Sequence, residues 1–349
     1  MTEPDPNRTA TNNDESTRSE VTLRDRINRV AYIVVNVSDL SRSRAFYESV
    51  TPLRPLSEFT APPQSFRGLG LERGSFRACA MTDGNGTFAT EIHLVEWTSP
   101  RTDGEAYPIF WHIGLAKMAF VIPGAKAKLA ELAAHDIRPT NRDIYRNYVS
   151  VLDPDGTCVS FAGLSYEGIE PAFAPRLTHV NPSVTDIGKA MQFYGHFLGL
   201  DLAYESRPCE PIPSSQGPGS DIAQWDSHLY TARGDARVHI DISELSFPPR
   251  TPDQCRPYQS ATNRGIARIG LEVDDLDRVH DIVTAARDTG VELEIMAPPE
   301  EWDLGERGRS RVLCITDPDG IRLEFVEKPR VAPIDGCRNP VNPAPVRAY

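Results

Sequence analysis

The sequence predicts an α+β fold in which four strand–helix–strands units form two tandem domains. The main observation is a tight Asp-Pro-Asp-Gly turn that runs into a strand of alternating apolar and polar residues. This pattern occurs at 153–156 and again at 317–320. A Phe-Tyr pair within a helical pattern also occurs twice, at 46–47 and 193–194. We therefore interpret the second half of the chain as a duplicate of the first.

Composition and charge restrict the class of protein. The chain has 349 residues, of which 40% are hydrophobic and 25% charged, as in a soluble globular protein. Its net charge of −12 argues against nucleic-acid binding, and no apolar run is long enough for a membrane span. Six cysteines without a C-x-x-C pair indicate reduced thiols and a cytoplasmic protein.

The first predicted domain covers residues 27–165 and follows a polar tail, residues 1–26, which we expect to be disordered. It contains two units, each beginning with a β-rich apolar run followed by a short amphipathic helix. The predicted strands are 30–37, 76–81, 90–97 and 117–122, and the predicted helices are 41–50 and 125–135. The first Asp-Pro-Asp-Gly turn closes this domain.

The second predicted domain covers residues 176–328 and follows a linker rich in Pro and Gly, residues 166–175. Its units begin with strands at 177–186 and 267–276, and their helices include 191–194 and 279–289. The strand after the second Asp-Pro-Asp-Gly turn carries Glu324, a carboxylate within a largely apolar segment. A Pro-rich tail, residues 329–349, ends the chain.

These motifs, together with Val37-Ser38-Asp39-Leu40 before the first helix, resemble those of the vicinal oxygen chelate superfamily. That family includes glyoxalase I, bleomycin-resistance proteins, methylmalonyl-CoA epimerase, fosfomycin-resistance enzymes and extradiol dioxygenases. The resemblance implies that paired units form curved mixed sheets, each pair enclosing one cavity. It also implies that site residues stand at the start of a unit's first strand and near the end of its last strand.

In the second domain the resemblance places His179, Asp241, Arg268 and Glu324 at these positions. It implies a divalent metal (Mg, Mn, Fe, Ni or Zn) held by His179, Asp241 and Glu324. Asp241 and Glu324 are also the candidate catalytic carboxylates, and Arg268 is the candidate substrate-binding residue. The alternative is a site without a metal, in which Arg268 forms a buried ion pair with Asp241 or Glu324. His228 and His239 are nearby alternative ligands.

The first domain carries Tyr32, His93, Lys117 and Ser160 at the corresponding positions. Lys and Ser are poor metal ligands, so we expect a degenerate site there, with His93 packed as a structural strand residue.

The second domain also has a longer segment before its last hairpin. We expect residues 294–311 to form a lid over the site, with a surface excursion or a dimer contact as the alternative. Residues 209–219 form a second expected loop.

The resemblance implies an enzyme acting on an oxygenated or anionic small organic molecule, without nucleic-acid or membrane partners. The first hypothesis is a metal-assisted isomerase, epimerase or lyase that moves a proton. A ring-cleaving or other iron-dependent dioxygenase is the second, although Arg268 replaces the histidine that such enzymes need. A metal-free binding or resistance protein is the third. A homodimer is an open alternative to a monomer.

Overall fold

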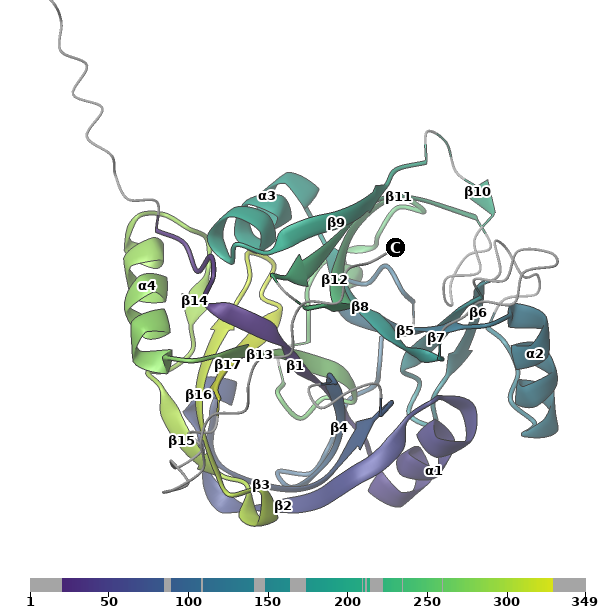
Figure 1. Cartoon of the computed structure of the whole chain (residues 1–349), viewed down its shortest axis with the longest axis horizontal. Helices are drawn as coiled ribbons and strands as arrows, with labels where there is room; N and C mark the ends of the chain where they lie inside the picture. Colours follow the sequence, from purple (N-terminus) through teal and green to yellow (C-terminus); the bar gives the residue numbers. More distant parts are fainter. Residues whose placement is uncertain are drawn as a thin grey trace, which may run out of the picture.

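We describe a computed structural model of the chain. It describes residues 21–84, 89–107, 109–140, 148–163, 174–208, 210, 212–213, 222–233, 235–258 and 260–328. In this part of the chain the strands form two curved mixed sheets, which we call sheet A and sheet B, with helices around them (Figure 1). No helix in these ranges is long and apolar enough to cross a membrane.

Sheet A joins the first and the fourth unit. Its strands, in order across the sheet, are β14 (Glu294–Ile295), β16 (Arg309–Thr316), β17 (Arg322–Glu327), β13 (Gly265–Val273), β1 (Ile27–Asn36), β4 (Glu91–Ser99), β3 (Leu71–Thr82) and β2 (Arg54–Phe66), with β15 (Glu300–Asp303) paired to β16. The two units meet where β1 and β13 pair antiparallel. Within each unit the first and last strands are parallel, β1 with β4 and β13 with β17.

Sheet B joins the second and the third unit. Its order is β10 (Ile212–Pro213), β11 (Ile222–Ala232), β12 (Asp235–Phe247), β8 (Arg176–Val184), β5 (Gly114–Ile122), β7 (Cys158–Gly163) and β6 (Tyr148–Leu152), with β9 (Asp201–Ser206) paired to β11. The two units meet where β5 and β8 pair antiparallel.

The predicted α+β class and its curved sheets of paired units are confirmed, but the partners of the units differ from our expectation. We expected each half of the sequence to build its own sheet. Each half instead contributes one unit to sheet A and one to sheet B. The difference arises at the first strands of the units, because β1 forms its backbone hydrogen bonds with β13 and β5 forms its own with β8.

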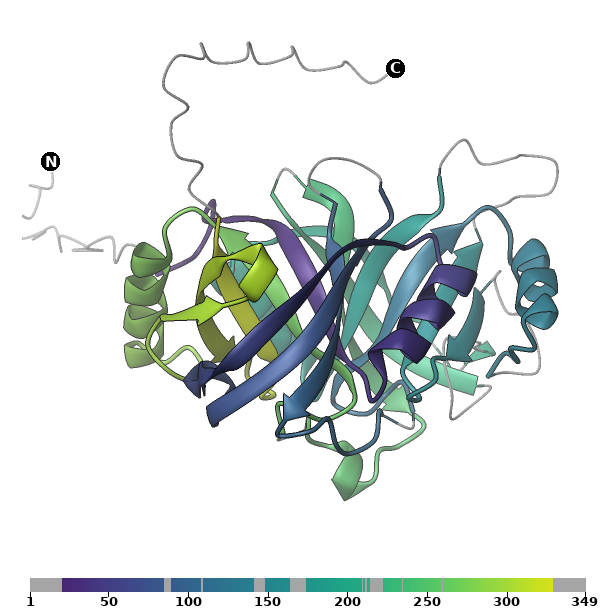
Figure 2. The same cartoon turned by 90° about the horizontal axis from the view of Figure 1, so that it is seen from below.

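The main core combines one face of both sheets with the helices α1 (Leu40–Val50), α2 (Ala125–Ala134), α3 (Ile187–Met191) and α4 (Leu276–Asp288). Strand alternation decides which residues enter it. On β1, Ile33 belongs to this core, while Tyr32 and Val34 pack in a separate cluster on the opposite face. We call that opposite face the inner face of each sheet. Figure 2 shows α4 and α2 at opposite ends of the molecule.

The duplicated motifs connect the two sheets. The Tyr47 hydroxyl on α1 donates to the Asp153 carboxylate of the first Asp-Pro-Asp-Gly turn, at 3.1 Å. The Tyr194 hydroxyl, on the π-helical continuation of α3 (Gln192–Phe197), donates to Asp317 of the second turn at 3.0 Å. Each half of the sequence is therefore held together by its helix and its turn, although its two units belong to different sheets.

Residues 21–26 correct the prediction that the whole N-terminal tail is disordered. Leu23 is fully buried in the main core, and its N–H donates to the carbonyl of Phe197 at 2.7 Å. The Thr22 hydroxyl donates to the carbonyl of His196 at 2.8 Å. Residues 1–20, most of the expected linker and the C-terminal tail from 329 onward lie outside the described residues.

Candidate functional site

The structure divides the predicted site residues between the two sheets. Arg268 and Glu324 lie on the inner face of sheet A, together with Tyr32 and His93 of the first unit. His179 and Asp241 lie on the inner face of sheet B, together with Lys117 and Ser160 of the second unit. The expectation that His179, Asp241, Arg268 and Glu324 line one cavity is therefore wrong, because their units belong to different sheets.

On sheet A, Glu324 is held by a cation and a hydroxyl. Its side chain is 1% exposed, and its Oε1 lies 2.5 Å from Nε of Arg268. The contact lacks hydrogen-bond geometry, so it is an ion pair. The Tyr32 hydroxyl donates to Glu324 Oε2 at 2.8 Å. Burial and the neighbouring Glu324 raise the pKa of Tyr32, so the hydroxyl keeps its proton and remains a donor.

A glycine makes this arrangement possible. Gly270 lies opposite Tyr32 on the neighbouring strand, and a Cβ atom there would come within 2.4 Å of the Tyr32 ring. Gly270 also lies beside Glu324 in the β13–β17 pair. The Tyr32 ring thus crosses the backbone of β13 to reach the carboxylate, which no larger residue at 270 would permit.

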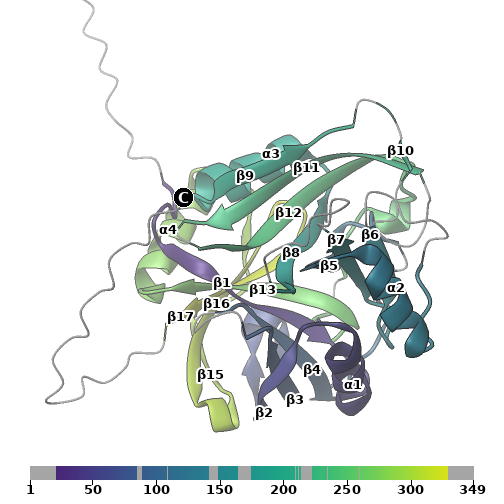
Figure 3. The same ribbon diagram turned by 45° about the vertical axis from the view of Figure 1, so that its right-hand side comes forward.

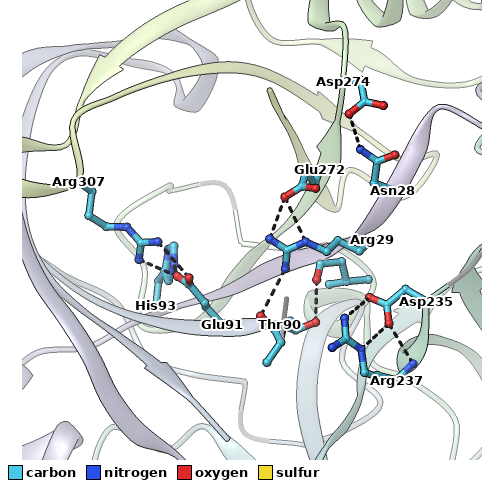
Figure 4. A network of polar contacts seen from close by, with 12 residues as sticks. Asn28, Arg29, Thr90, Glu91, His93, Asp235, Arg237, Glu272, Asp274 and Arg307 are labelled. Carbon is cyan, nitrogen blue, oxygen red and sulfur yellow. Dashed lines mark hydrogen bonds and ion pairs between the residues drawn. The ribbon is translucent and has the colours of Figure 1, made fainter. Parts of the chain in front are cut away.

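His93 belongs to a second polar chain on the same inner face (Figure 4). Its ring stacks on Tyr32 with centroids 4.5 Å apart, and its Nε2 lies 2.6 Å from Glu91 Oε2. Arg307 donates to both oxygens of Glu91, at 2.6 and 3.0 Å. Burial alone would raise the pKa of Glu91, but the hydrogen bonds from His93 and Arg307 lower it to about 2. Burial lowers the pKa of His93, which is consistent with the predicted packed, structural histidine.

The predicted lid lies over sheet A and not over His179 and Asp241. Residues 294–311 contain β14, β15 and a 3-10 turn (Gly305–Arg307), and they lead into β16. Figures 1 and 3 show β15 beside β2 of the first unit. Gln64 exchanges two hydrogen bonds with the backbone of Asp303, at 2.6 and 2.8 Å, and Glu300 pairs with Arg67 at 2.8 Å. Trp302 is buried against Phe66. The segment is therefore an integral part of sheet A, where it joins the fourth unit to β2 of the first unit.

On sheet B, Asp241 accepts from neutral donors on two neighbouring strands. Asn181 Nδ2 donates to its Oδ2 at 2.5 Å and to its backbone carbonyl at 3.1 Å. The Ser227 hydroxyl donates to its Oδ1. Asp241 is 8% exposed, and these bonds fix the carboxylate in one orientation.

Lys117 and His179 complete the site on sheet B. Lys117 is 3% exposed and lies opposite Asn181 in the β5–β8 pair. Burial lowers its pKa, and the nearby Asp241 carboxylate opposes that shift. Its Nζ lies 5.3 Å from the centre of the Phe110 ring. His179 Nε2 lies 3.8 Å from Asp241 Oδ2 and has no hydrogen-bond partner in the part of the chain that the structure describes. Burial lowers the pKa of His179 to about 4, so the ring is neutral at physiological pH.

The other candidates have bonds of their own. Ser160 shares a 2.8 Å hydrogen bond with Ser150. His228 contacts Asp226 at 3.0 Å, and His239 contacts the carbonyl of Thr178 at 3.2 Å. Only part of the second expected loop, 209–219, is described, so that prediction stays untested.

The predicted divalent metal does not fit this arrangement. Its three ligands fall on two sheets, Glu324 on one and His179 with Asp241 on the other. Arg268 occupies the position beside Glu324 that a cation would need. Nowhere in the described ranges do three or more His, Cys, Asp or Glu side chains converge as a metal site requires. We therefore derive no step of a reaction through a metal ion.

Sequence reasoning missed Lys117, which was assigned to a degenerate half, and also Asn181 and Ser227. A signal for Asn181 was present, because it stands two residues after His179 and must share its face of the strand. Lys117 could be recognised only by knowing that its strand pairs with that of His179.

Comparisons with known proteins agree with this fold. Residues 176–325 match the family described as the Glyoxalase/Bleomycin resistance protein/Dioxygenase superfamily. Glyoxalase I from Zea mays is a similar solved structure, with a TM-score of 0.59 at 14% identity, covering 86% of this chain and 92% of that one. A putative dioxygenase from Bacillus subtilis has a TM-score of 0.53 at 14% identity, covering 87% and 86%.

No curated protein matches the chain by sequence. At these identities the solved structures establish the fold and leave the activity open. The family match covers the third and fourth units, and the solved structures share the fold of all four.

Proposed function

We propose that the protein is a small-molecule enzyme whose working site is the inner face of sheet B. Its reaction would be a proton transfer next to a carbonyl or enol oxygen, as in an isomerase, epimerase or lyase. The observation that carries the proposal is the convergence of a buried lysine, a neutral histidine and an oriented carboxylate: Lys117, His179 and Asp241. Perturbed pKa values of buried groups concentrate at functional sites.

Each residue has a role that follows from its surroundings. Lys117 supplies the positive charge that stabilises an oxyanion forming on the substrate. His179 accepts the proton, because its Nε2 has no hydrogen-bond partner among the residues described and its ring is neutral above about pH 4. Asp241 stabilises the imidazolium that results and balances the charge of Lys117. Asn181 and Ser227 position Asp241.

Sheet A supports no comparable role. Glu324 is bound by Arg268 and Tyr32, and His93 is bound by Glu91. The segment 294–311 is packed on the same sheet. Removing one partner from such a buried pair leaves an uncompensated charge, so these residues act on stability. Variants on this face therefore serve as controls.

Solvent isotope exchange tests the proposal without knowledge of the natural substrate. The protein is incubated in D₂O with a panel of 2-oxo and 2-hydroxy acids, and loss of the proton next to the carbonyl is followed by NMR. We expect exchange in the wild type and in Tyr32→Phe, and its loss in Lys117→Met and His179→Gln. Exchange that survives both sheet B substitutions would refute the assignment.

The alternative function is a binding or resistance protein without turnover. Aromatic side chains favour it, because Phe110 and Trp225 line a pocket beside Lys117. Ligand binding that requires Lys117, with no exchange for any member of the panel, would select this alternative.

A further inference from the structure

A small cavity beside Lys117 indicates what the site on sheet B recognises. It has a volume of about 10 Å³. A space of that size holds one water molecule or one hydroxyl group. Its wall is polar at Lys117, Asn181 and Ser243 and apolar at Phe110 and Trp225. The cavity therefore has room for a single polar group.

Asn181, which lines that space, carries a hydrogen-bond acceptor without a partner. Its Nδ2 is committed to Asp241, but its Oδ1 is buried and has no hydrogen-bond partner among the described residues. Asn181 itself is 5% exposed. A buried acceptor without a partner is costly, and in a native structure it indicates a missing donor.

Lys117 supplies hydrogen-bond donors at the same cavity. It lies directly across from Asn181 in the β5–β8 pair, and both line the cavity. An ammonium group carries three N–H donors and no acceptor. A group between these two side chains must accept from Lys117 and donate to Asn181 at once. A hydroxyl does both, whereas an ether or a carbonyl oxygen cannot donate and an ammonium cannot accept.

We infer that the site recognises a hydroxyl group of its ligand, held between Lys117 Nζ and Asn181 Oδ1, and that the substrate is a hydroxylated organic acid or carbonyl compound with an apolar body. This inference rests on the proposed function and names the substrate class for the same site. His179 lies two residues from Asn181 on the same strand face, so a carbon next to this hydroxyl comes within its reach.

Calorimetric binding of three matched probes tests the inference. The probes are 2-hydroxy-3-phenylpropanoate, 3-phenylpropanoate without the hydroxyl, and 2-methoxy-3-phenylpropanoate, which cannot donate. We expect the hydroxy acid to bind roughly tenfold or more tightly than either of the others, which corresponds to about 1.4 kcal/mol. Asn181→Leu should abolish this preference. Tyr32→Phe on sheet A should leave it unchanged.

The outcomes separate this inference from the proposed function. Equal affinity for the hydroxy and deoxy acids, or no binding of the hydroxy acid at all, overturns the hydroxyl-recognition site. If isotope exchange still depends on Lys117 and His179, the proposed function survives that result. Should Asn181→Leu fail to fold, the comparison of the three probes on the wild type still decides the matter.

Discussion

Replacing Arg268 with methionine should destabilise the protein by about 4 kcal/mol at pH 7. The change removes the cation that lies 2.5 Å from Glu324, a carboxylate whose side chain is 1% exposed. Breaking a buried ion pair from one side costs about 3–5 kcal/mol.

Urea denaturation followed by the fluorescence of the buried Trp97 and Trp302 measures this cost. The double variant Arg268→Met/Glu324→Gln should recover more than half of the loss. A loss below about 1 kcal/mol at pH 7 would refute the buried ion pair.

Three further results are expected. Burial raises the pKa of Asp317 to about 7 against the opposing hydrogen bonds, so stability should fall as the pH rises from about 4 to about 7. Asp317→Asn should remove this slope in urea denaturation, and an unchanged slope would contradict the assignment. Leu23→Ala should cost about 2–4 kcal/mol in the same assay if the segment before β1 belongs to the core, whereas a cost near zero would mean that it does not. Isotope exchange should fall below about pH 4, where His179 becomes protonated. It should fall again on the alkaline side, where Lys117 loses its charge, and this second fall should begin below the ordinary lysine pKa of 10.5 because burial lowers the pKa of Lys117. An acid limb near pH 6.5 would point to an unperturbed histidine.

The strand–helix units could be predicted because their signals are local. Asp-Pro-Asp-Gly turns, helix caps and alternating strands depend on neighbouring residues, and the Phe-Tyr repeat revealed the duplication. The hydrogen bonds of Tyr47 to Asp153 and of Tyr194 to Asp317 give a physical reason for the repeat, since each joins a helix to the turn of its own half.

The pairing of units could not be predicted in the same way. Which first strands lie side by side is decided by packing between segments far apart in the chain. The β1–β13 junction needs Gly270 beneath the Tyr32 ring, a contact that no local pattern reports. Assigning partners by sequence order placed Glu324 with His179, and it separated Lys117 from His179. That one choice produced the wrong metal triad and the wrong place for the lid.

A double-mutant cycle on the free energy of unfolding tests the division of the site most directly. The cycle between Lys117→Met and Asp241→Asn should give a coupling of about 1 kcal/mol or more, because both charges lie on sheet B and attract each other. The cycle between Lys117→Met and Glu324→Gln should be additive within about 0.5 kcal/mol, because these residues lie on different sheets. Strong coupling of Lys117 to Glu324, with none to Asp241, would contradict the pairing of the units and the site built on it.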